Sequence, residues 1–259
     1  MQGEARTGWV STLLVLVLLV VGWETAVQWL KTPPILFPAP SAIWAEFLLA
    51  PPYFLRNALY TLWTTLAGFG LAVALGLGLA VAIVSSRLAE RLIYTLLVVL
   101  NSLPKVALAP LFVIWMGTGV EPKIAIALML AIFAIVADAA HGLRSIDPDA
   151  LALARVHRAS GWQVLVKLRL PNAMPALFVG MKVAVSFALV GAIVGEFVGG
   201  SAGLGYVILM AQGQFDTPRV FVALVLLGLM GTVLFFLVAA LERAIIPWHV
   251  SQRASHGGS

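Results

Sequence analysis

Six long apolar segments, separated by shorter polar stretches, constrain the fold of this chain more than any other feature. A transmembrane helix needs about 20 mostly apolar residues to cross the hydrocarbon core of a bilayer. The chain is 61% hydrophobic and only 10% charged, whereas about a quarter of the residues of a soluble domain are charged. We therefore expect an all-α integral membrane protein. The six segments are approximately Trp9–Leu30, Ala58–Val84, Leu92–Met116, Ile124–Ala140, Ala176–Val198 and Val220–Leu241.

Composition excludes several kinds of chemistry. The chain has no cysteine, so disulfides, thiolate metal sites and cysteine nucleophiles are excluded. No cluster of His, Asp or Glu has the spacing of a metal site, and we expect no metal ligands, no catalytic residues and no cofactor on this chain. It also lacks a G-x-x-x-x-G-K-[ST] loop for ATP. The basic residues behind its net charge of +5 flank apolar segments, which indicates membrane orientation rather than nucleic-acid binding.

The distribution of Lys and Arg predicts the orientation of the chain. With the N-terminus inside the cell, ten of these residues fall on the inner side and four on the outer side, while Lys105 and Lys182 lie within apolar segments. Inner loops are enriched in Lys and Arg. We therefore expect both termini, and the polar stretch 142–171, in the cytoplasm. The first segment is longer than a signal-peptide core and no small-residue cleavage site follows it, so we expect an uncleaved span.

Three regions are expected along the chain. Residues 1–57 would hold the first span and a proline-rich outer loop, 58–245 the core transmembrane domain, and 246–259 a disordered cytoplasmic tail. Proline fixes φ and removes a donor, so the outer loop should be shaped, non-helical backbone, apart from a short interfacial helix that Ser41 would cap. Pro104 predicts a kink or break in the third span.

The polar stretch 142–171 begins with a signal for a short helix. Asp147 is a suitable N-cap, and Pro148 follows at the first helical position, where a missing N–H costs nothing. We expect this helix to run from Pro148 to about Arg158.

A second short helix should follow directly. Ser160 and Gln163 have the spacing of a capping box, so this helix would begin at Gly161. It should end at Pro171, whose ring disfavours α geometry at Leu170. The two helices would form an elbow at the membrane surface.

Two interpretations of this elbow are open. It could rest on lipid as an amphipathic element, or it could insert into a groove of another protein. Four alanines, at positions 150, 152, 154 and 159, lie in its first helix or directly after it, and Trp162 is its only aromatic residue. Small residues suit close insertion into a protein groove better than lipid anchoring, so we favour contact with a protein.

The elbow resembles the coupling loop of bacterial ABC importer permeases. The signature of that loop is Glu-Ala-Ala, three residues, Gly, nine residues, Ile, one residue, Leu-Pro. Leu170–Pro171 matches its end, Leu168 takes the Ile position, and Ala152–Ala154 takes the Glu-Ala-Ala position. The chain departs from the signature at Ala152, which replaces Glu, and at Arg158, which replaces Gly. Since that Gly permits a tight bend, Arg158 must bend the chain by other means.

Three further motifs extend the resemblance. Leu36–Trp44, Leu103–Gly119 and Gly195–Ile208 look like motifs of nitrate-, sulfonate-, taurine- and bicarbonate-type permeases, in the same order and spacing. The match covers about residues 35–245.

The resemblance implies a type I ABC importer-like fold in a bacterial inner membrane. The implied partners are two copies of a cytoplasmic ABC ATPase, which would bind ATP and Mg, a second permease copy in a homodimer, and a periplasmic substrate-binding protein. The residues that would couple to the ATPase are Asp149, Ala152, Leu153, Ala154, Arg155, His157, Arg158, Ser160, Gly161 and Trp162.

Lys105 is the first candidate for the translocation path. Ionisable residues within spans are functional candidates, because each is costly unless it is paired or wetted. Lys105 lies near the middle of the third span, one turn after Asn101. We expect the pair to face the path and to favour a small anionic solute. The alternative is a structural pair of Lys105 with Asp138 or Glu196.

The outer end of the fifth span supplies the other candidates. Glu196 precedes a glycine-rich stretch, 199–205, in which Gly203 and Gly205 could line an outer gate or form a simple turn. Lys182 should reach the interface or pair with Asp138. A membrane-embedded enzyme would need a nucleophile or an acid/base pair at membrane depth, and a secondary transporter often shows an inverted repeat. Neither signal is present.

Overall fold

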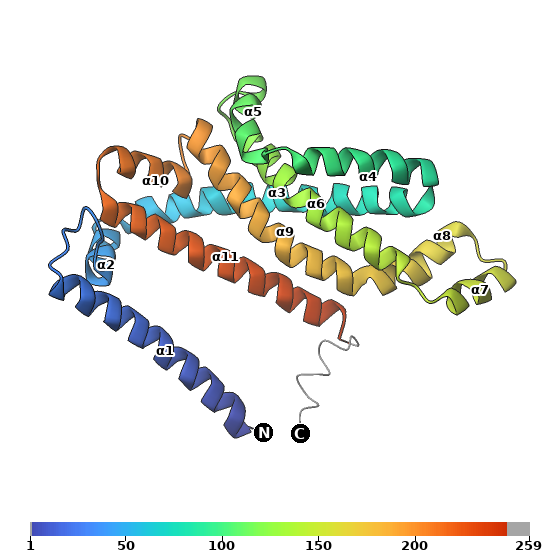
Figure 1. The fold of residues 1–259 in the computed structure, drawn as a ribbon, viewed down its shortest axis with the longest axis horizontal. Coiled ribbons are helices and arrows are strands. Elements are labelled where there is room, and N and C mark those ends of the chain that lie inside the picture. The colour runs from blue at the N-terminus through green and yellow to red at the C-terminus, as the bar shows by residue number, and fades with distance from the viewer. Residues whose placement is uncertain (1, 248–259) are drawn as a thin grey trace.

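The computed structural model describes residues 2–247, with side chains from residue 14 onward. Within this range the chain is helical and has no β-strand, which confirms the predicted all-α fold (Figure 1). Most of the expected tail, residues 248–259, lies outside the described residues. The elements are α1 (Gln2–Trp29), α2 (Pro40–Leu49), α3 (Pro51–Ser85), α4 (Arg87–Ser102), η1 (Lys105–Leu108), α5 (Ala109–Met116), α6 (Glu121–Arg144), α7 (Pro148–Val156), α8 (Gly161–Val164), η2 (Leu165–Arg169), α9 (Leu170–Gly199), α10 (Leu204–Gly213) and α11 (Thr217–Ile245).

Each predicted apolar segment corresponds to a helix or a bent pair of helices. Four helices are long and apolar enough to cross a membrane: α3, α6, α11 and a continuous helix of 39 residues, Gly161–Gly199. The third segment is broken between Ser102 and Lys105, and α4 meets the following helix at 87°, as the prolines predict. The first segment corresponds to α1, whose described apolar part, Leu14–Trp29, is shorter than these spans. Four of the six predicted spans are therefore confirmed among the described residues, or five with the bent pair counted as one.

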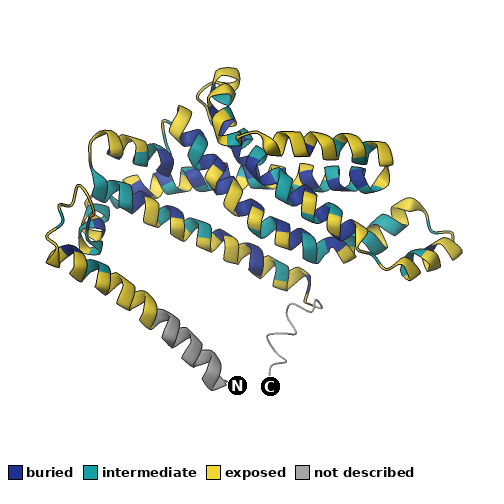
Figure 2. Cartoon of the chain, viewed as in Figure 1, coloured by how far each residue is buried: buried dark blue, intermediate teal, exposed yellow. Residues whose placement is uncertain are grey.

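The core of the molecule is the packing of α3, α6 and α9, and small residues allow these helices to approach closely. A Cβ added at Gly68 of α3 would lie 2.5 Å from Ala127 Cβ, and one at Gly191 of α9 would lie 2.6 Å from Ala127 Cα. Ala127 of α6 is therefore held between two glycines. Gly70 and Gly78 have no neighbour within 4 Å of an added Cβ, so they face away from this core. Figure 2 shows the buried residues concentrated on these three helices, while α4 and the described part of α1 are mostly exposed.

Helices extend further into the outer loop than the sequence predicts. The second span begins at Pro51 rather than Ala58, because Pro51 and Pro52 occupy the first turn of α3, where a proline is tolerated. Ser41 does not cap α2, which begins at Pro40 after Ala39. Instead, the Ser41 hydroxyl and backbone N–H both donate to the Glu24 carboxylate, at 2.7 and 2.9 Å, and so join α1 to α2.

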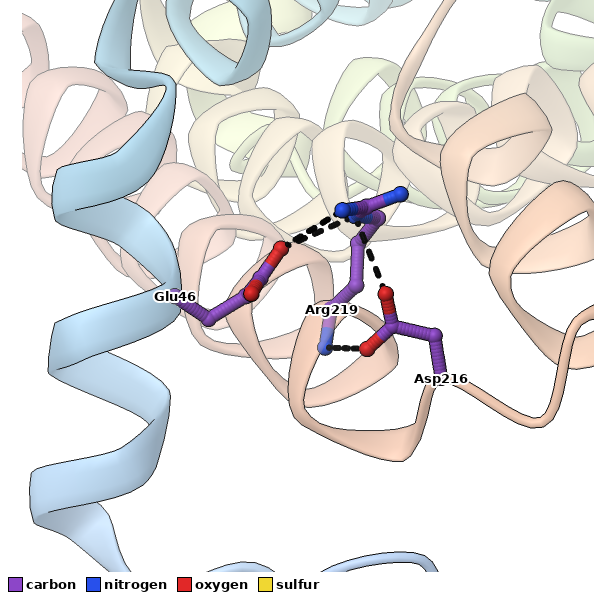
Figure 3. A network of polar contacts seen from close by, with 3 residues as sticks. All are labelled: Glu46, Asp216 and Arg219. Atoms are coloured by element: carbon purple, nitrogen blue, oxygen red, sulfur yellow. Dashed lines mark hydrogen bonds and ion pairs between the residues drawn. The ribbon is translucent and has the colours of Figure 1, made fainter.

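The molecule has two distinct ends. Helices α2 and α10 lie at one end, and α7 and α8 lie at the other (Figure 1). At the first end, Arg219 of α11 bonds Glu46 of α2 at 2.9 Å and Asp216 at 3.3 Å (Figure 3). These contacts fix α2 against the start of α11.

Candidate coupling elbow and translocation site

The first helix of the elbow starts as predicted and ends earlier. Asp147 is the N-cap of α7, and its carboxylate accepts a hydrogen bond of 2.9 Å from the Asp149 N–H. The helix ends at Val156 rather than near Arg158.

Arg158 makes the bend itself, by adopting a left-handed backbone conformation with φ +54°. The Ala159 N–H donates to the Ala154 carbonyl at 3.0 Å, and the Arg158 N–H donates to the Arg155 carbonyl at 2.9 Å. This pair of bonds is a Schellman motif, in which glycine normally occupies the left-handed position. The residue that replaces the signature glycine therefore bends the chain without help from Gly161, at a cost of about 1–2 kcal/mol for a non-glycine residue.

The second helix of the elbow has the predicted capping box. The Gln163 N–H donates to Ser160 Oγ at 3.3 Å, and the Ser160 N–H donates to Gln163 Oε1 at 2.8 Å. Both contacts are local, so the short spacing in the sequence was sufficient to predict them.

The prediction that this helix ends at Pro171 is wrong. Leu170 has helical φ and ψ of −63° and −49°, and the chain continues without a break from Gly161 to Gly199. The turn before the proline, Leu165–Arg169, is π-helical. A π turn widens the helix and shifts its hydrogen bonds by one residue, so the proline ring escapes the clash with the carbonyl four residues earlier. The second helix of the elbow and α9 therefore form one continuous helix.

Nine of the ten residues predicted to couple to the ATPase are exposed on the elbow. Leu153 and Trp162 are the two largest apolar side chains in this set, and they are 60% and 72% exposed. Ala154 is the exception, because it is buried against the chain itself. Its exposed neighbours are Asp149, Ala152, Leu153, Arg155, His157, Arg158, Ser160, Gly161 and Trp162.

Lys105 and Asn101 meet in a cavity beside the bend of the third span. Lys105 Nζ donates to Asn101 Oδ1 at 2.5 Å and lies 5.7 Å from the centre of the Phe133 ring. The cavity has a volume of about 570 Å³, and Phe133 and Phe187 form part of its wall. The alternative pairing of Lys105 with Asp138 or Glu196 is wrong, since neither carboxylate bonds it.

Glu196 joins three helices beneath the glycine-rich turn, and it is fully buried. Its carboxylate accepts from Thr61 Oγ1 of α3 at 2.8 Å and from the Gly205 N–H at 2.7 Å. Thr61 Oγ1 in turn accepts from the Leu204 N–H at 2.8 Å. We call this set, together with Asn57 and Gly203, the outer junction.

Asn57 and Gly203 complete the outer junction. Asn57 Oδ1 accepts from the Gly203 N–H at 2.8 Å. Gly203 has φ +107°, and a Cβ there would lie 2.2 Å from Glu196 Cδ, so only glycine fits. Glu196, Gly203 and Gly205 are all buried in this conformation, and their predicted part in the translocation path stays a prediction.

Lys123 and Lys182 lie in environments that the sequence did not indicate. Lys123, which lies between the third and fourth predicted segments, is fully buried in α6, where its Nζ donates to the carbonyls of Gly119 at 2.5 Å and Gly199 at 3.2 Å. Glu121 opens α6 before it, and an acidic residue followed by proline is a helix-start signal that places Lys123 in the first turn. Lys182 pairs with Glu242 of α11 at 2.5 Å, not with Asp138.

Asn57 and Thr61 also went unnoticed in the sequence, although a signal was present. They are four residues apart and share one face of α3, together with Thr65. Polar residues at helical spacing within an apolar span mark a face turned toward other protein groups.

The comparisons with known proteins agree with this arrangement. Residues 72–247 match the family model described as binding-protein-dependent transport system inner membrane component. The chain is 34% identical to a riboflavin transport system permease of Chloroflexus aurantiacus over 91% of this chain and 89% of that protein. It is 33% identical to a formylaminopyrimidine transport permease of Halalkalibacterium halodurans, over 93% and 96%. It is 31% identical to a putative aliphatic sulfonates transport permease of Escherichia coli, over 89% of each.

Solved structures share the fold. A chain of the inward-facing methionine ABC transporter superposes with a TM-score of 0.67 at 20% identity, over 75% of this chain and 97% of that one. A chain of an amino acid ABC transporter superposes with a TM-score of 0.63 at 17% identity, over 78% and 98%. The chain therefore belongs to the family of binding-protein-dependent transport system inner membrane components, and it is a multi-pass permease subunit of an ABC importer.

Proposed function

We propose that this permease converts the motion of a cytoplasmic ATPase into transport through the elbow formed by residues 148–163. The observation that carries the proposal is the unbroken helix Gly161–Gly199, which begins in the elbow and ends in the outer junction. A helix of this length spans about 60 Å at 1.5 Å per residue. Displacement of the elbow would therefore move the centre of the core directly, since α9 packs against α6, which lies between α9 and α3.

The elbow has the surface that an ATPase groove would need. Leu153 and Trp162 are large apolar side chains without a covering element among the described residues, and such patches mark contact sites. We propose that two ATPase copies, which bind ATP and Mg, contact two copies of this permease through these elbows. Both termini and the elbow would then lie in the cytoplasm, as the Lys and Arg distribution indicates.

The cavity around Lys105 is the part of the translocation path that we propose for the solute. A single ammonium group, an amide and two phenyl rings line it. An ammonium group at this depth favours an anion, and the phenyl rings favour an apolar body. We propose that the solute is a small organic anion, delivered from outside by a periplasmic binding protein.

Cross-linking tests the coupling proposal. Since the chain has no cysteine, Leu153→Cys introduces a unique thiol on the elbow, and Leu59→Cys introduces a matched one near the outer end of α3, where Leu59 is 65% exposed. Membranes that contain the permease and its partner ATPase should give a permease–ATPase cross-link with Leu153→Cys and none with Leu59→Cys. Equal yields from both variants would refute the contact.

Uptake measurements test the solute proposal. Lys105→Met should lower uptake of an anionic solute about tenfold or more, because a hydrogen bond to a charged group contributes about 1.5–3 kcal/mol. Lys105→Arg keeps the charge and should retain most of the uptake. Unchanged transport and unchanged preference for anions in Lys105→Met would end the proposal.

A further inference from the structure

A second cavity, of about 560 Å³, lies between the elbow and the inner end of α3. We call it the elbow cavity. Its walls come from three places: Val81 and Ser85 at the end of α3, Arg155 of α7, and Trp162 and Arg169 in the second half of the elbow. It is separate from the Lys105 cavity, with which it shares no lining residue.

Two guanidinium groups face the elbow cavity from different elements. Arg155 and Arg169 both line it, and neither forms an ion pair or a side-chain hydrogen bond within the described residues. No acidic side chain lines the cavity. The two charges therefore face the same space without a protein anion, which favours an anionic ligand.

Apart from Ser85, the rest of the lining has no polar side chain other than the indole of Trp162. Val81, Val84 and Leu165 form part of the wall, and they pack against the core cluster of α3, α6 and α9. A free inorganic anion would gain nothing from these groups. An amphiphile with an anionic head and an apolar tail matches both halves of the cavity.

The end of an apolar span beside the cavity indicates the depth of the lipid headgroups. Helix α3 ends at Ser85, and Arg87 follows directly. Arg155, Arg169 and Trp162 line the cavity next to this end of α3, and basic residues and tryptophan beside the end of an apolar span are typical of the membrane–water interface. The phosphate layer of the inner leaflet is negatively charged and attracts basic residues at this level.

We propose that the elbow cavity binds an anionic phospholipid of the inner leaflet, with its phosphate between Arg155 and Arg169 and its first acyl carbons against Val81 and Leu165. A lipid in this position fills the space between α3 and the elbow. The lipid therefore sets the angle between the elbow and the core. On the proposed coupling mechanism, it is a structural part of the connection between the elbow and the helix Gly161–Gly199.

Photo-cross-linking of the full-length permease in nanodiscs tests this site. The probes are phosphatidylglycerol and phosphatidylcholine that carry the same diazirine near the carbonyl end of one acyl chain. Phosphatidylglycerol should label the peptide around Val81–Ser85, and the double variant Arg155→Gln/Arg169→Gln should lower that labelling by on the order of tenfold. Phosphatidylcholine should label it weakly in both proteins.

The control removes two cations from the same segments outside the cavity. Arg158→Gln/Lys167→Gln changes the net charge equally and should leave the labelling within about twofold of the unaltered protein. Ser85→Phe fills the cavity without changing charge and should also abolish labelling. Inorganic phosphate at millimolar concentration should not compete with the lipid probe.

Three results would overturn the proposal. Phosphatidylcholine could label the peptide as strongly as phosphatidylglycerol, which would make the cavity a non-selective apolar groove. The two double variants could lose labelling equally, which would reduce the effect to general surface charge. Inorganic phosphate could displace the probe, which would assign the guanidinium groups to a soluble anion. None of these readouts depends on the ATPase, so they leave the coupling proposal untouched.

Discussion

The two ends of the molecule hold their turns by different means. In the elbow, Ser160 and Gln163 bond each other across three residues, and the surrounding surface is exposed. In the outer junction, the bond between Asn57 and Gly203 joins groups 146 residues apart, and the partners are buried. A turn that is stabilised locally can be displaced as a unit, whereas a turn bonded to three helices is fixed to them. If the elbow transmits the motion of an ATPase as we propose, the elbow is the part that is displaced and the outer junction is the part that stays fixed.

Among the variants that test this comparison, Gly203→Ala should have the largest effect on stability. The φ of +107° is accessible essentially only to glycine, and the added methyl group would clash with Glu196 Cδ. Strain and overpacking together should lower the free energy of unfolding by about 3 kcal/mol or more. Thermal unfolding of the purified permease in detergent measures this. Gly213→Ala, where an added Cβ meets nothing, is the control and should be neutral or stabilising.

Glu196→Leu should have the next largest effect, about 2 kcal/mol, because it leaves buried donors without an acceptor. Thr61→Val should cost a similar amount. The two residues bond each other, so the double variant should be less destabilised than the sum of the two single variants. A double-mutant cycle on the unfolding midpoints checks this, and strict additivity would show that the outer junction is not one network.

These long-range contacts mark the limit of what the sequence could predict. The break near Pro104, the Asp147 cap and the capping box depend on short spacing, and all three are confirmed. The six spans depend on composition, and four of them, or five with the bent pair, are confirmed among the described residues. The three-dimensional partners of Lys123 and Glu196 depend on which helix ends meet, and no local pattern specifies that.

The course of the chain through Pro171 was missed for a different reason. The rule that a proline ends a helix assumes α geometry before it, and the π turn at Leu165–Arg169 removes that assumption. The bend at Arg158 is similar, because the sequence shows the missing glycine but not that arginine takes the left-handed conformation itself.

Ser160→Ala should have a smaller and local effect. Loss of the N-cap should destabilise the start of the second elbow helix by about 1 kcal/mol, which corresponds to roughly fivefold faster amide exchange at Gln163. Hydrogen exchange read out by mass spectrometry measures this, with Ser160→Thr as the conservative control. A change that spreads to the peptides of the outer junction would contradict the local character of the elbow.

Arg158→Gly should have the smallest effect and the opposite sign. Glycine relieves the left-handed strain but gives the unfolded chain more freedom, so the net stabilisation should be about 1 kcal/mol or less. Amide exchange at Ala159, which donates the Schellman bond, should slow slightly, while Arg158→Ala should leave it unchanged. Faster exchange in Arg158→Gly would show that the arginine side chain, rather than the bend, stabilises the elbow.

The central claim is that the helix Gly161–Gly199 transmits motion from the elbow to the core. The most direct test measures the ratio of solute transported to ATP hydrolysed after this helix is interrupted. Two glycines inserted after Leu168 would leave the exposed elbow surface intact but break the helix Gly161–Gly199 between the elbow and the core. In proteoliposomes that contain the permease, its ATPase and its binding protein, ATP hydrolysis should persist while uptake falls at least about tenfold, since a flexible joint cannot transmit displacement. An unchanged ratio of uptake to hydrolysis would contradict transmission through this helix.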